Sequence, residues 1–434
     1  MAPQAASVAK QQSKIALFNP SIFTSWVRLH VLFLLIFSGN AASRTIVKTL
    51  PGFSGELPFT LETGYVGVGY SDEVQLFYYF VESQRSPSQD PLMLWLTGGP
   101  GCSCLSAFFY ESGPLNFDYL NYNGSLPTLH LNSYAWTQSL NIIYVDAPVG
   151  TGFSYSKTQQ GYYVDDYSSA ANTYQFLMKW LVDHPQFMTN QLYIGGDSYS
   201  GIPVPMIVQE IYDGNEAGRD PYMNLKGYVL GNPVTDSFLD DNSKIPFAHR
   251  MTLISDDLYE AAKDSCNGDF VNVYDATCEM NILAINEDYN YVLVGGWAND
   301  QTVREALNVR NGTKGYWARC NSSIAYTKDV TSTVPYHRNL TSKILRSLVY
   351  SGDHDMSIPH LGTQRWIKTL NMTLDDTWRA WFVDGQVAGY TQKYLDDDYS
   401  MVYATVKGAG HVAPEYKAKE CYAMIDRFFA NFPL

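Results

Sequence analysis

Residues 192–201 (LYIGGDSYSG) carry the pattern that decides the fold of this chain. A short apolar run rich in β-forming residues ends in two glycines, Ser198 follows, and residues 202–212 have helical character. This is the order of a nucleophile elbow, in which a serine with strained backbone angles stands between a strand and a helix. The positions two before and two after that serine must be small, and Gly196 and Ser200 meet this requirement. The stretch therefore predicts that Ser198 is a nucleophile.

The helix predicted after Ser198 adds two expectations. Its N-terminus faces the serine, so its dipole and free N–H groups would favour negative charge that develops there. We also expect Gly201 to let the helix lie close to the strand. A bare Gly-x-Ser-x-Ser match is weak, because serine-rich loops produce it often. The rest of the chain must therefore decide whether the elbow is real.

Short apolar runs and helical segments alternate along the chain. The predicted strands are residues 65–70, 75–82, 91–97, 141–146, 192–196, 225–230, 346–350 and 401–407, the first two forming a hairpin. Residues 166–183 have the periodicity of a helix. The alternation predicts an α/β fold with a mixed, mostly parallel sheet covered by helices on both faces. Catalytic groups on such sheets lie at the carboxyl ends of strands.

Two further groups lie just past strand ends and complete a triad in the order Ser…Asp…His, which α/β-hydrolases use. Asp353 and Asp355 both follow the strand at 346–350, and we prefer Asp355 as the acid. Only His360 and His411 come after these aspartates, and His360 is too close in sequence to Asp355. His411 would then take the proton of Ser198, while Asp355 fixes its tautomer.

Composition excludes some functions. The chain has 434 residues and a net charge of −14, so nucleic acid is not an expected partner. Its six cysteines are an even number, which is typical of disulfides in an oxidising compartment. No two cysteines have C-x-x-C spacing, so we expect no zinc site, and nothing indicates another metal or a cofactor.

The N-terminus has the features of a secretory signal peptide. Residues 1–55 contain no Asp or Glu, basic residues precede the apolar run 31–37, and small residues follow at 39–43. A transmembrane anchor is the alternative, but the run is shorter than the roughly 20 residues needed to span a bilayer. We predict that residues 1–43 are a signal peptide and that the mature protein is vacuolar or extracellular, with no stable membrane anchor. Predicted glycosylation sites are Asn123, Asn311, Asn321, Asn339 and Asn371.

Seven motifs in one order give the chain a family resemblance. They are residues 95–103 (WLTGGPGCS), 111–114 (ESGP), 146–155 (DAPVGTGFSY), 196–201 (GDSYSG), 231–233 (GNP), 352–355 (GDHD) and 410–415 (GHVAPE). This set closely resembles the serine carboxypeptidases and, more narrowly, the plant serine carboxypeptidase-like acyltransferases, from about residue 60 to the C-terminus. The resemblance implies one α/β-hydrolase domain over residues 44–434, with a helical cap insertion at roughly 234–300. It also implies an oxyanion hole formed by the backbone N–H groups of Gly99 and Tyr199.

The resemblance also implies a disulfide pattern. Cys102 would pair with Cys320, and Cys266 with Cys278, whereas Cys104 and Cys421 match no pair. After Cys278 the chain lacks some tens of residues that family members usually have, including a disulfide. We therefore expect a shortened insertion and one continuous chain.

The resemblance further identifies the substrate-binding positions Thr97, Gly98, Glu111 and Asp197. Peptidase members hold a C-terminal carboxylate with Asn at position 97, the Gly98 N–H, Glu111 and a Glu at position 197. Threonine cannot supply the paired donors of an amide, and Asp197 withdraws its carboxyl by roughly 1.5 Å. Aspartate at position 197 is what the acyltransferases show.

We therefore predict transfer of an acyl group from a 1-O-β-acylglucose to an acceptor hydroxyl, through an acyl-enzyme on Ser198. A serine carboxypeptidase or esterase, with water as the second nucleophile, is the main alternative. A secreted glycoprotein with an inactive site that serves only for binding is the third. The intact set Ser198, Asp355 and His411 argues against that last reading.

Overall fold

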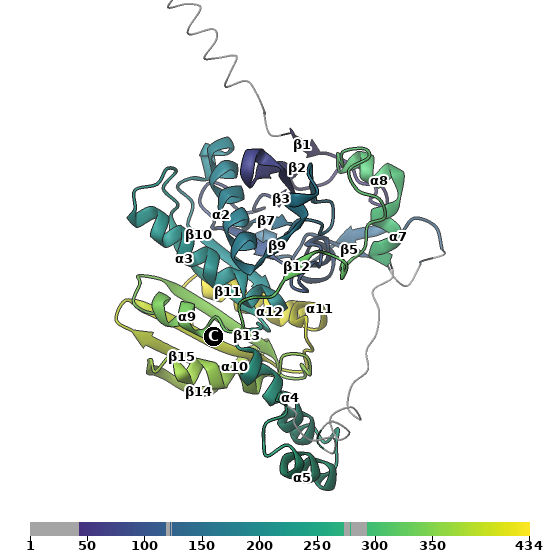
Figure 1. Cartoon of the computed structure of the whole chain (residues 1–434). Helices are drawn as coiled ribbons and strands as arrows, with labels where there is room; N and C mark the ends of the chain where they lie inside the picture. Colours follow the sequence, from purple (N-terminus) through teal and green to yellow (C-terminus); the bar gives the residue numbers. More distant parts are fainter. Residues whose placement is uncertain (1–42, 119–121, 123, 273–277, 279–292) are drawn as a thin grey trace, which may run out of the picture. The chain divides into compact units, whose positions relative to one another are not determined.

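The structure, a computed structural model, describes residues 43–118, 122, 124–272, 278 and 293–434 (Figure 1). The chain divides into two units, residues 1–43 and 44–434. The predicted signal peptide thus lies outside the described residues except for Ser43. In the part that is described, no helix has both the length and the apolar character needed to cross a membrane.

The second unit is built on a 12-stranded mixed sheet. Its order is β1 (Ser43–Val47), β2 (Leu61–Val68), β3 (Val74–Val81), β7 (Asn141–Val145), β4 (Leu92–Leu96), β10 (Leu192–Asp197), β11 (Leu225–Gly231), β13 (Arg346–Gly352), β16 (Tyr399–Val406), β15 (Gln386–Asp396) and β14 (Thr373–Val383), with β8 (Tyr155–Ser156) paired to β3. The six strands from β7 to β16 are parallel, and β3 and β15 flank them in antiparallel pairing. The predicted α/β class is confirmed.

The central strands are apolar without interruption because both faces of the sheet are buried. Successive side chains of a strand point to opposite faces. In β4, Met93 and Trp95 therefore belong to one hydrophobic cluster, and Leu92, Leu94 and Leu96 belong to the other. All five are buried. The two clusters cover the two faces of the sheet.

Helices complete both clusters. One cluster includes side chains of α2 (Asp166–Asp183), α3 (Pro203–Glu216) and α10 (His360–Thr369). The other includes side chains of the π-helix η2 (Ala107–Glu111), α7 (Leu293–Asn299) and α12 (Ala418–Phe429). The helix predicted at 166–183 coincides with α2. The one predicted at 202–212 is α3, which follows the 3-10 turn η6 (Ser198–Gly201).

The remaining elements are short or belong to the insertion. They are β5 (Leu115–Phe117), β6 (Leu129–Leu131), β9 (Val164–Asp165), β12 (Tyr326–Thr327), α4 (Ser237–Arg250), α5 (Asp256–Ser265), α8 (Gln301–Ala306), α9 (Val334–Leu340), α11 (Ala413–Tyr416), and the 3-10 turns η1 (Tyr70–Asp72), η3 (Trp136–Gln138), η4 (Gln160–Tyr162) and η5 (Pro185–Phe187). Within the predicted insertion, α4, α5 and α7 are helical. The shortened stretch after Cys278 lies outside the described residues.

Strands β14 and β15 are absent from the sequence prediction. They form the open end of the sheet, and β14 is its edge strand. In β14 only Trp381 is buried, so the strand lacks the continuous apolar run that marks the central strands. An exposed edge strand does not need that signal.

Candidate active site

Ser198 stands at the sharp turn between β10 and η6. Its φ is 55°, in the left-handed region that residues other than glycine rarely adopt. Its surroundings are tight: a Cβ on Gly98 would lie 2.5 Å from the Ser198 Cβ, and a Cβ on Gly196 would lie 2.5 Å from the Ser200 Cβ. A strained serine among small residues is the local geometry that the sequence predicts.

Gly201 has a different neighbour from the one we expected. A Cβ at this position would lie 2.1 Å from the carbonyl oxygen of Val234 and 2.7 Å from Pro233 Cβ. The Val234 N–H donates to the carbonyl oxygen of Ser198 at 2.8 Å. Glycine is therefore needed where the segment after β11 approaches the elbow, whereas we had expected it to let the helix lie close to the strand.

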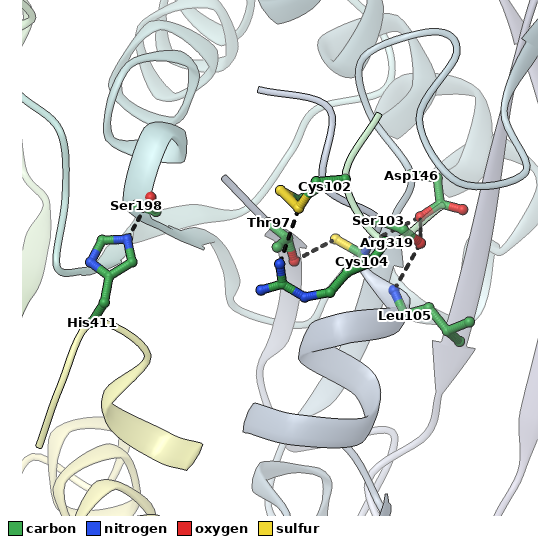
Figure 2. Close-up of a disulfide and its surroundings, with 10 residues drawn as sticks. Thr97, Cys102, Ser103, Cys104, Leu105, Asp146, Ser198, Arg319 and His411 are labelled. Carbon is green, nitrogen blue, oxygen red and sulfur yellow. Dashed lines mark hydrogen bonds between the residues drawn. A yellow bond between two sulfur atoms is a disulfide. The ribbon is translucent and has the colours of Figure 1, made fainter. Parts of the chain in front are cut away.

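Ser198, His411 and Asp355 form a chain of hydrogen bonds. His411 Nε2 lies 2.8 Å from Ser198 Oγ, as Figure 2 shows, and His411 Nδ1 lies 2.8 Å from Asp355 Oδ2. The three residues follow β10, β16 and β13, strands of the parallel part of the sheet whose carboxyl ends meet at one edge. This is the arrangement of nucleophile, base and orienting acid.

The structure separates the two candidate acids. Asp355 is 1% exposed, and its Oδ1 accepts the backbone N–H groups of Ser357 and Ile358 at 2.8 and 3.2 Å. Its Oδ2, which faces His411, also accepts from Asn232 Nδ2 at 2.7 Å. Asp353 instead accepts from the backbone N–H of Gly408. Only Asp355 can orient His411.

The charges around His411 favour its protonated form. Burial alone would lower the pKa of His411, but the facing Asp355 carboxylate and the nearby Asp197 raise it above its usual value of 6.5, against a smaller opposing effect of Arg319. With Asp355 on the Nδ1 side, Nε2 is left to accept the proton of Ser198. An imidazolium formed during reaction would be stabilised by the same carboxylate.

Gly99 and Tyr199 line the cleft next to Ser198 and His411. Gly99 has a φ of 115°, which glycine adopts at no steric cost. Tyr199 is in the first turn of η6, where backbone N–H groups have no partner within the helix. The two N–H groups are the predicted oxyanion donors.

The buried carboxylate of Asp146 fixes the loop that carries Gly99. Its Oδ1 accepts from Ser103 Oγ at 2.6 Å and from the Cys104 N–H at 3.0 Å, and its Oδ2 accepts from the Phe153 N–H at 2.9 Å. Burial raises the pKa of Asp146 to about 6, although these hydrogen bonds oppose the shift. Figure 2 shows this contact beside the disulfide at Cys102.

Two buried carboxyl groups, Asp197 and Glu111, interact behind Ser198. Burial raises the pKa of Asp197 to about 6, against the opposing effects of His411, Arg319 and nearby N–H groups. Burial and the negative charge of Asp197 raise the pKa of Glu111 well above its usual range. Glu111 Oε2 and Asp197 Oδ1 have no hydrogen-bond partner in the described part of the chain. Both carboxyl groups thus have raised pKa values, and both present an oxygen available to a ligand.

Thr97 and Arg319 complete this side of the site. The Thr97 hydroxyl donates to Cys104 Sγ at 3.4 Å, and that thiol donates to the carbonyl oxygen of Trp95 at 3.2 Å. The guanidinium of Arg319 donates to Cys320 Sγ at 3.1 Å (Figure 2). The positive charge of Arg319, a residue next to a disulfide, favours ionisation of both Asp197 and Glu111.

A cleft of about 770 Å³ opens from Ser198. Apolar side chains form much of its wall, among them Ile202, Val234 and Met356, and Lys244 and Lys328 also line it. A volume of this size holds a small organic ligand. Glu111 is not among the residues that line this cleft.

Both predicted disulfides are confirmed. Cys102 pairs with Cys320, 218 residues apart, and Cys266 pairs with Cys278. Cys104 and Cys421 are buried free thiols. Of the predicted glycosylation sites, Asn311, Asn339 and Asn371 are exposed, Asn321 is half-buried and donates to the Gly150 carbonyl oxygen, and Asn123 lies outside the described residues.

Sequence reasoning assigned no role to Asn232 or Arg319. Asn232 follows β11, one of the parallel strands that ends at the site, so its position after a strand was a usable signal. Arg319 follows no strand, and it reaches the site because Cys320 is bonded to Cys102. No local pattern marks such a residue.

The pH dependence of ester turnover should report on His411. The base must be neutral to act, so kcat/KM should fall as pH drops through the raised pKa of His411. Since Asp197 is one of the charges that raise this pKa, Asp197→Asn should move the acidic limb to lower pH. The measurement is a pH–kcat/KM profile, with Asp353→Asn as the control that leaves the limb in place. A shift to higher pH, or none, would contradict this account.

Comparison with known proteins agrees with this architecture. Residues 51–291 and 277–431 match the Serine carboxypeptidase family. The chain is 48% identical to Serine carboxypeptidase-like 1 of Arabidopsis thaliana over 433 residues, which cover 94% of this chain and 97% of that protein. It is 47% identical to Serine carboxypeptidase-like 17 of the same plant over 437 residues, 95% and 99% of the two chains.

A solved structure shows the same fold. A prohormone-processing carboxypeptidase from Saccharomyces cerevisiae has a TM-score of 0.74 to this chain, with 19% sequence identity, and the match covers 89% of this chain and 95% of that one. The family match covers most of the sequence, and the shared fold agrees with it. The chain belongs to the serine carboxypeptidase family.

Proposed function

We propose that this protein is an acyltransferase that moves an acyl group from a 1-O-β-acylglucose to an acceptor hydroxyl. Ser198 attacks the ester carbonyl while His411 takes its proton, and the N–H groups of Gly99 and Tyr199 stabilise the oxyanion. His411 then protonates the departing glucose oxygen, leaving the acyl group on Ser198. In the second step His411 takes the proton of the acceptor hydroxyl, which attacks the acyl-enzyme and releases Ser198.

The leaving-group side of the site carries this proposal. Recognition of a C-terminal carboxylate needs donors, and Thr97 offers one hydroxyl, whose hydrogen bond goes to Cys104 Sγ. Glu111 and Asp197 present carboxyl oxygens without partners in the described residues. Carboxyl oxygens are acceptors that suit sugar hydroxyls. A polyol therefore fits this side better than a carboxylate.

Transfer must compete with water, which is always present. An acceptor that is bound and oriented when the acyl-enzyme forms has an effective molarity on the order of 10⁵ M or more, far above that of water. The proposal therefore requires that the acceptor occupy the site that glucose leaves. In this proposal Glu111, Asp197 and Thr97 border that site.

Carboxypeptidase activity is the second candidate, and the raised pKa values of the carboxyl pair are the observation that supports it. Burial raises the pKa of both Asp197 and Glu111, and a protonated carboxyl group can donate a hydrogen bond to a terminal carboxylate. The arginine beside them, Arg319, would also attract that anion. This activity would be greatest at acidic pH and would fall as the pair ionises.

Product analysis separates the two functions. The enzyme is incubated with a panel of 1-O-acylglucoses and candidate alcohols, and separately with N-blocked dipeptides, and the products are identified by mass. We expect acyl esters of at least one alcohol and slow cleavage of the dipeptides. Efficient release of amino acids without ester formation from any acceptor would show that the protein is a carboxypeptidase.

Restoring the peptidase residues should change how the acyl-enzyme partitions. In the double variant Thr97→Asn, Asp197→Glu, cleavage of blocked dipeptides should rise and the ratio of transfer to hydrolysis should fall. In this proposal both residues contact one ligand. The effect of the double substitution on this ratio should therefore exceed the product of the effects of the two single substitutions. The measurement is transferred ester against free acid at one acceptor concentration. An unchanged ratio would mean that these two positions do not decide the reaction.

We also propose that the mature protein is an exported glycoprotein that acts on small molecules. The support is the N-terminal apolar run after basic residues, the five sequons and two disulfides in the described chain. N-terminal sequencing of the mature protein, with its mass before and after deglycosylation, tests this. A mature chain that keeps residues 1–43 would contradict it.

A further inference from the structure

We propose that Asp166 is a positioning residue that holds Tyr199, and with it the oxyanion donor and the acyl-side wall of the cleft. The inference rests on the proposed role of Ser198 and goes beyond it, since Asp166 is not part of the triad and does not line the cleft. It stands on four hydrogen bonds to a carboxylate that is fully buried.

All four bonds run to the two oxygens of Asp166. Oδ1 accepts from the phenol groups of Tyr199 at 2.8 Å and Tyr326 at 2.7 Å. Oδ2 accepts from the backbone N–H groups of Asp329 at 2.8 Å and Val330 at 2.9 Å. The side chain is 0% exposed. The carboxylate thus joins the residue after Ser198 to a segment that is more than 100 positions away in the sequence.

The local structure brings these groups together. Asp166 is the first residue of α2 and directly follows β9, and β12, which contains Tyr326, pairs with β9 in parallel register (Figure 1). The two tyrosine rings meet edge to face, with centroids 6.1 Å apart. Burial and the Asp166 hydrogen bond raise the pKa of both phenols above their usual value, so both remain donors at all ordinary pH values. A carboxylate is the side chain that accepts from four such donors.

The held segment forms part of the cleft. Tyr199, Lys328 and Val330 all line it, and the ammonium of Lys328 lies 5.0 Å from the centroid of the Tyr199 ring. The backbone N–H of Tyr199 is also the proposed oxyanion donor. If the phenol is anchored, the peptide that carries this N–H has little freedom to move. Asp166 therefore acts on the reacting carbonyl through Tyr199, and on larger acyl groups through the wall at Lys328 and Val330.

Replacing the carboxylate by an amide breaks this arrangement without changing its size. In Asp166→Asn the amide oxygen can still accept from the two backbone N–H groups. Its NH₂ then faces the two phenols and can only donate, so both phenol hydrogens lose their acceptor in a buried place. Tyr199→Phe removes only the bond between Asp166 and the elbow and leaves the ring in place.

The test measures acylation of the full-length folded enzyme by p-nitrophenyl acetate in the pre-steady-state burst. The acetyl group is too small to need the wall at Lys328, so its rate reports on the oxyanion donor. We expect Asp166→Asn to slow acylation about 10- to 100-fold with KM within about twofold of wild type, below the loss for deleting a whole donor. Tyr199→Phe should slow it less, and in the double variant the losses should not multiply.

The control is Asp165→Asn, the adjacent N-cap of α2, whose side chain accepts from the Ser168 N–H. It perturbs the same helix end and should leave acylation unchanged, whatever its effect on the melting temperature. In Asp166→Asn, acylation by a second substrate, p-nitrophenyl benzoate, should slow by a larger factor than acylation by p-nitrophenyl acetate. The reason is that the benzoyl ring should contact the cleft wall at Lys328 and Val330.

If p-nitrophenyl acetate acylates folded Asp166→Asn at a rate within twofold of the wild-type rate, the inference is overturned and Asp166 is a purely structural residue. If that variant does not fold, Tyr199→Phe decides, and an unchanged burst rate overturns the inference equally. A burst that persists in Ser198→Ala would instead overturn the proposed function. The two failures are therefore distinguishable.

Discussion

Replacement of Ser198 by alanine should lower turnover of an activated ester by about 10⁶-fold and abolish covalent labelling by a fluorophosphonate probe. The hydroxyl at 2.8 Å from His411 Nε2 is the only group placed to form the acyl-enzyme within the described site. His411→Ala should cost a similar factor, because residues of a catalytic unit do not act independently. The measurement is the single-turnover rate with p-nitrophenyl acetate, together with the mass of the labelled protein.

Substitution of the orienting acid, Asp355, tests its hydrogen bond to His411 separately from the nucleophile. Asp355→Asn keeps the shape of the side chain but presents an amide to His411 Nδ1, and should reduce turnover by about 10⁴-fold. Asp353→Asn is the matched control, since its carboxylate accepts from the Gly408 N–H and does not touch the imidazole. Near-normal turnover in Asp355→Asn would contradict the assignment of the acid.

The sequence predicted the elements whose signal is local. The strands from β7 to β16 are apolar because both faces are buried, and the elbow needs small residues at fixed offsets from Ser198. Strands β14 and β15 gave no such signal, since their burial depends on lying at the open end of a sheet. Trp381, the one buried residue of β14, cannot by itself mark a strand.

The residues of the site also differ in how far the sequence alone predicts them. Ser198 and His411 were predictable because each follows a strand in a motif of its own. Asp355 was preferred over Asp353 from the sequence, but the two stand two residues apart after the same strand, and tertiary packing decides which one meets His411. Asp166 is joined to Tyr199 and to the wall of the cleft, and Arg319 to the site, through a pairing of short strands and a disulfide that join distant segments. Such connections leave no periodic pattern in the sequence.

The electrostatics of the site could not be read from residue types either. Asp197, Glu111 and Asp355 are all acids, yet their surroundings differ. Asp355 accepts two backbone N–H groups and an amide, whereas one oxygen each of Asp197 and Glu111 has no partner in the described residues and burial raises the pKa of both groups. Their different roles follow from the number of donors that the fold brings to each.

Substitution of Gly98 by alanine should also have a large effect, about a 10³-fold loss of kcat/KM. The added Cβ would lie 2.5 Å from the Ser198 Cβ and 2.7 Å from the Tyr199 backbone nitrogen, distances that real Cβ atoms do not show. The nucleophile and the oxyanion donor must both move. A misplacement of about 1 Å costs on the order of 10²-fold, and loss of an oxyanion donor costs about 10²- to 10³-fold.

This loss should arise from geometry and not from unfolding. Overpacking of this kind costs roughly 1–3 kcal/mol of stability, which a folded protein of this size tolerates. Gly315→Ala is the control, because an added Cβ there meets nothing within 4 Å, and it should leave both kcat/KM and the melting temperature unchanged. The measurement is kcat/KM for p-nitrophenyl acetate well below the melting temperature of each variant. If folded Gly98→Ala turns over at the wild-type rate, the loop at Gly98 and Gly99 is free to move away from Ser198, and its N–H cannot be a fixed oxyanion donor.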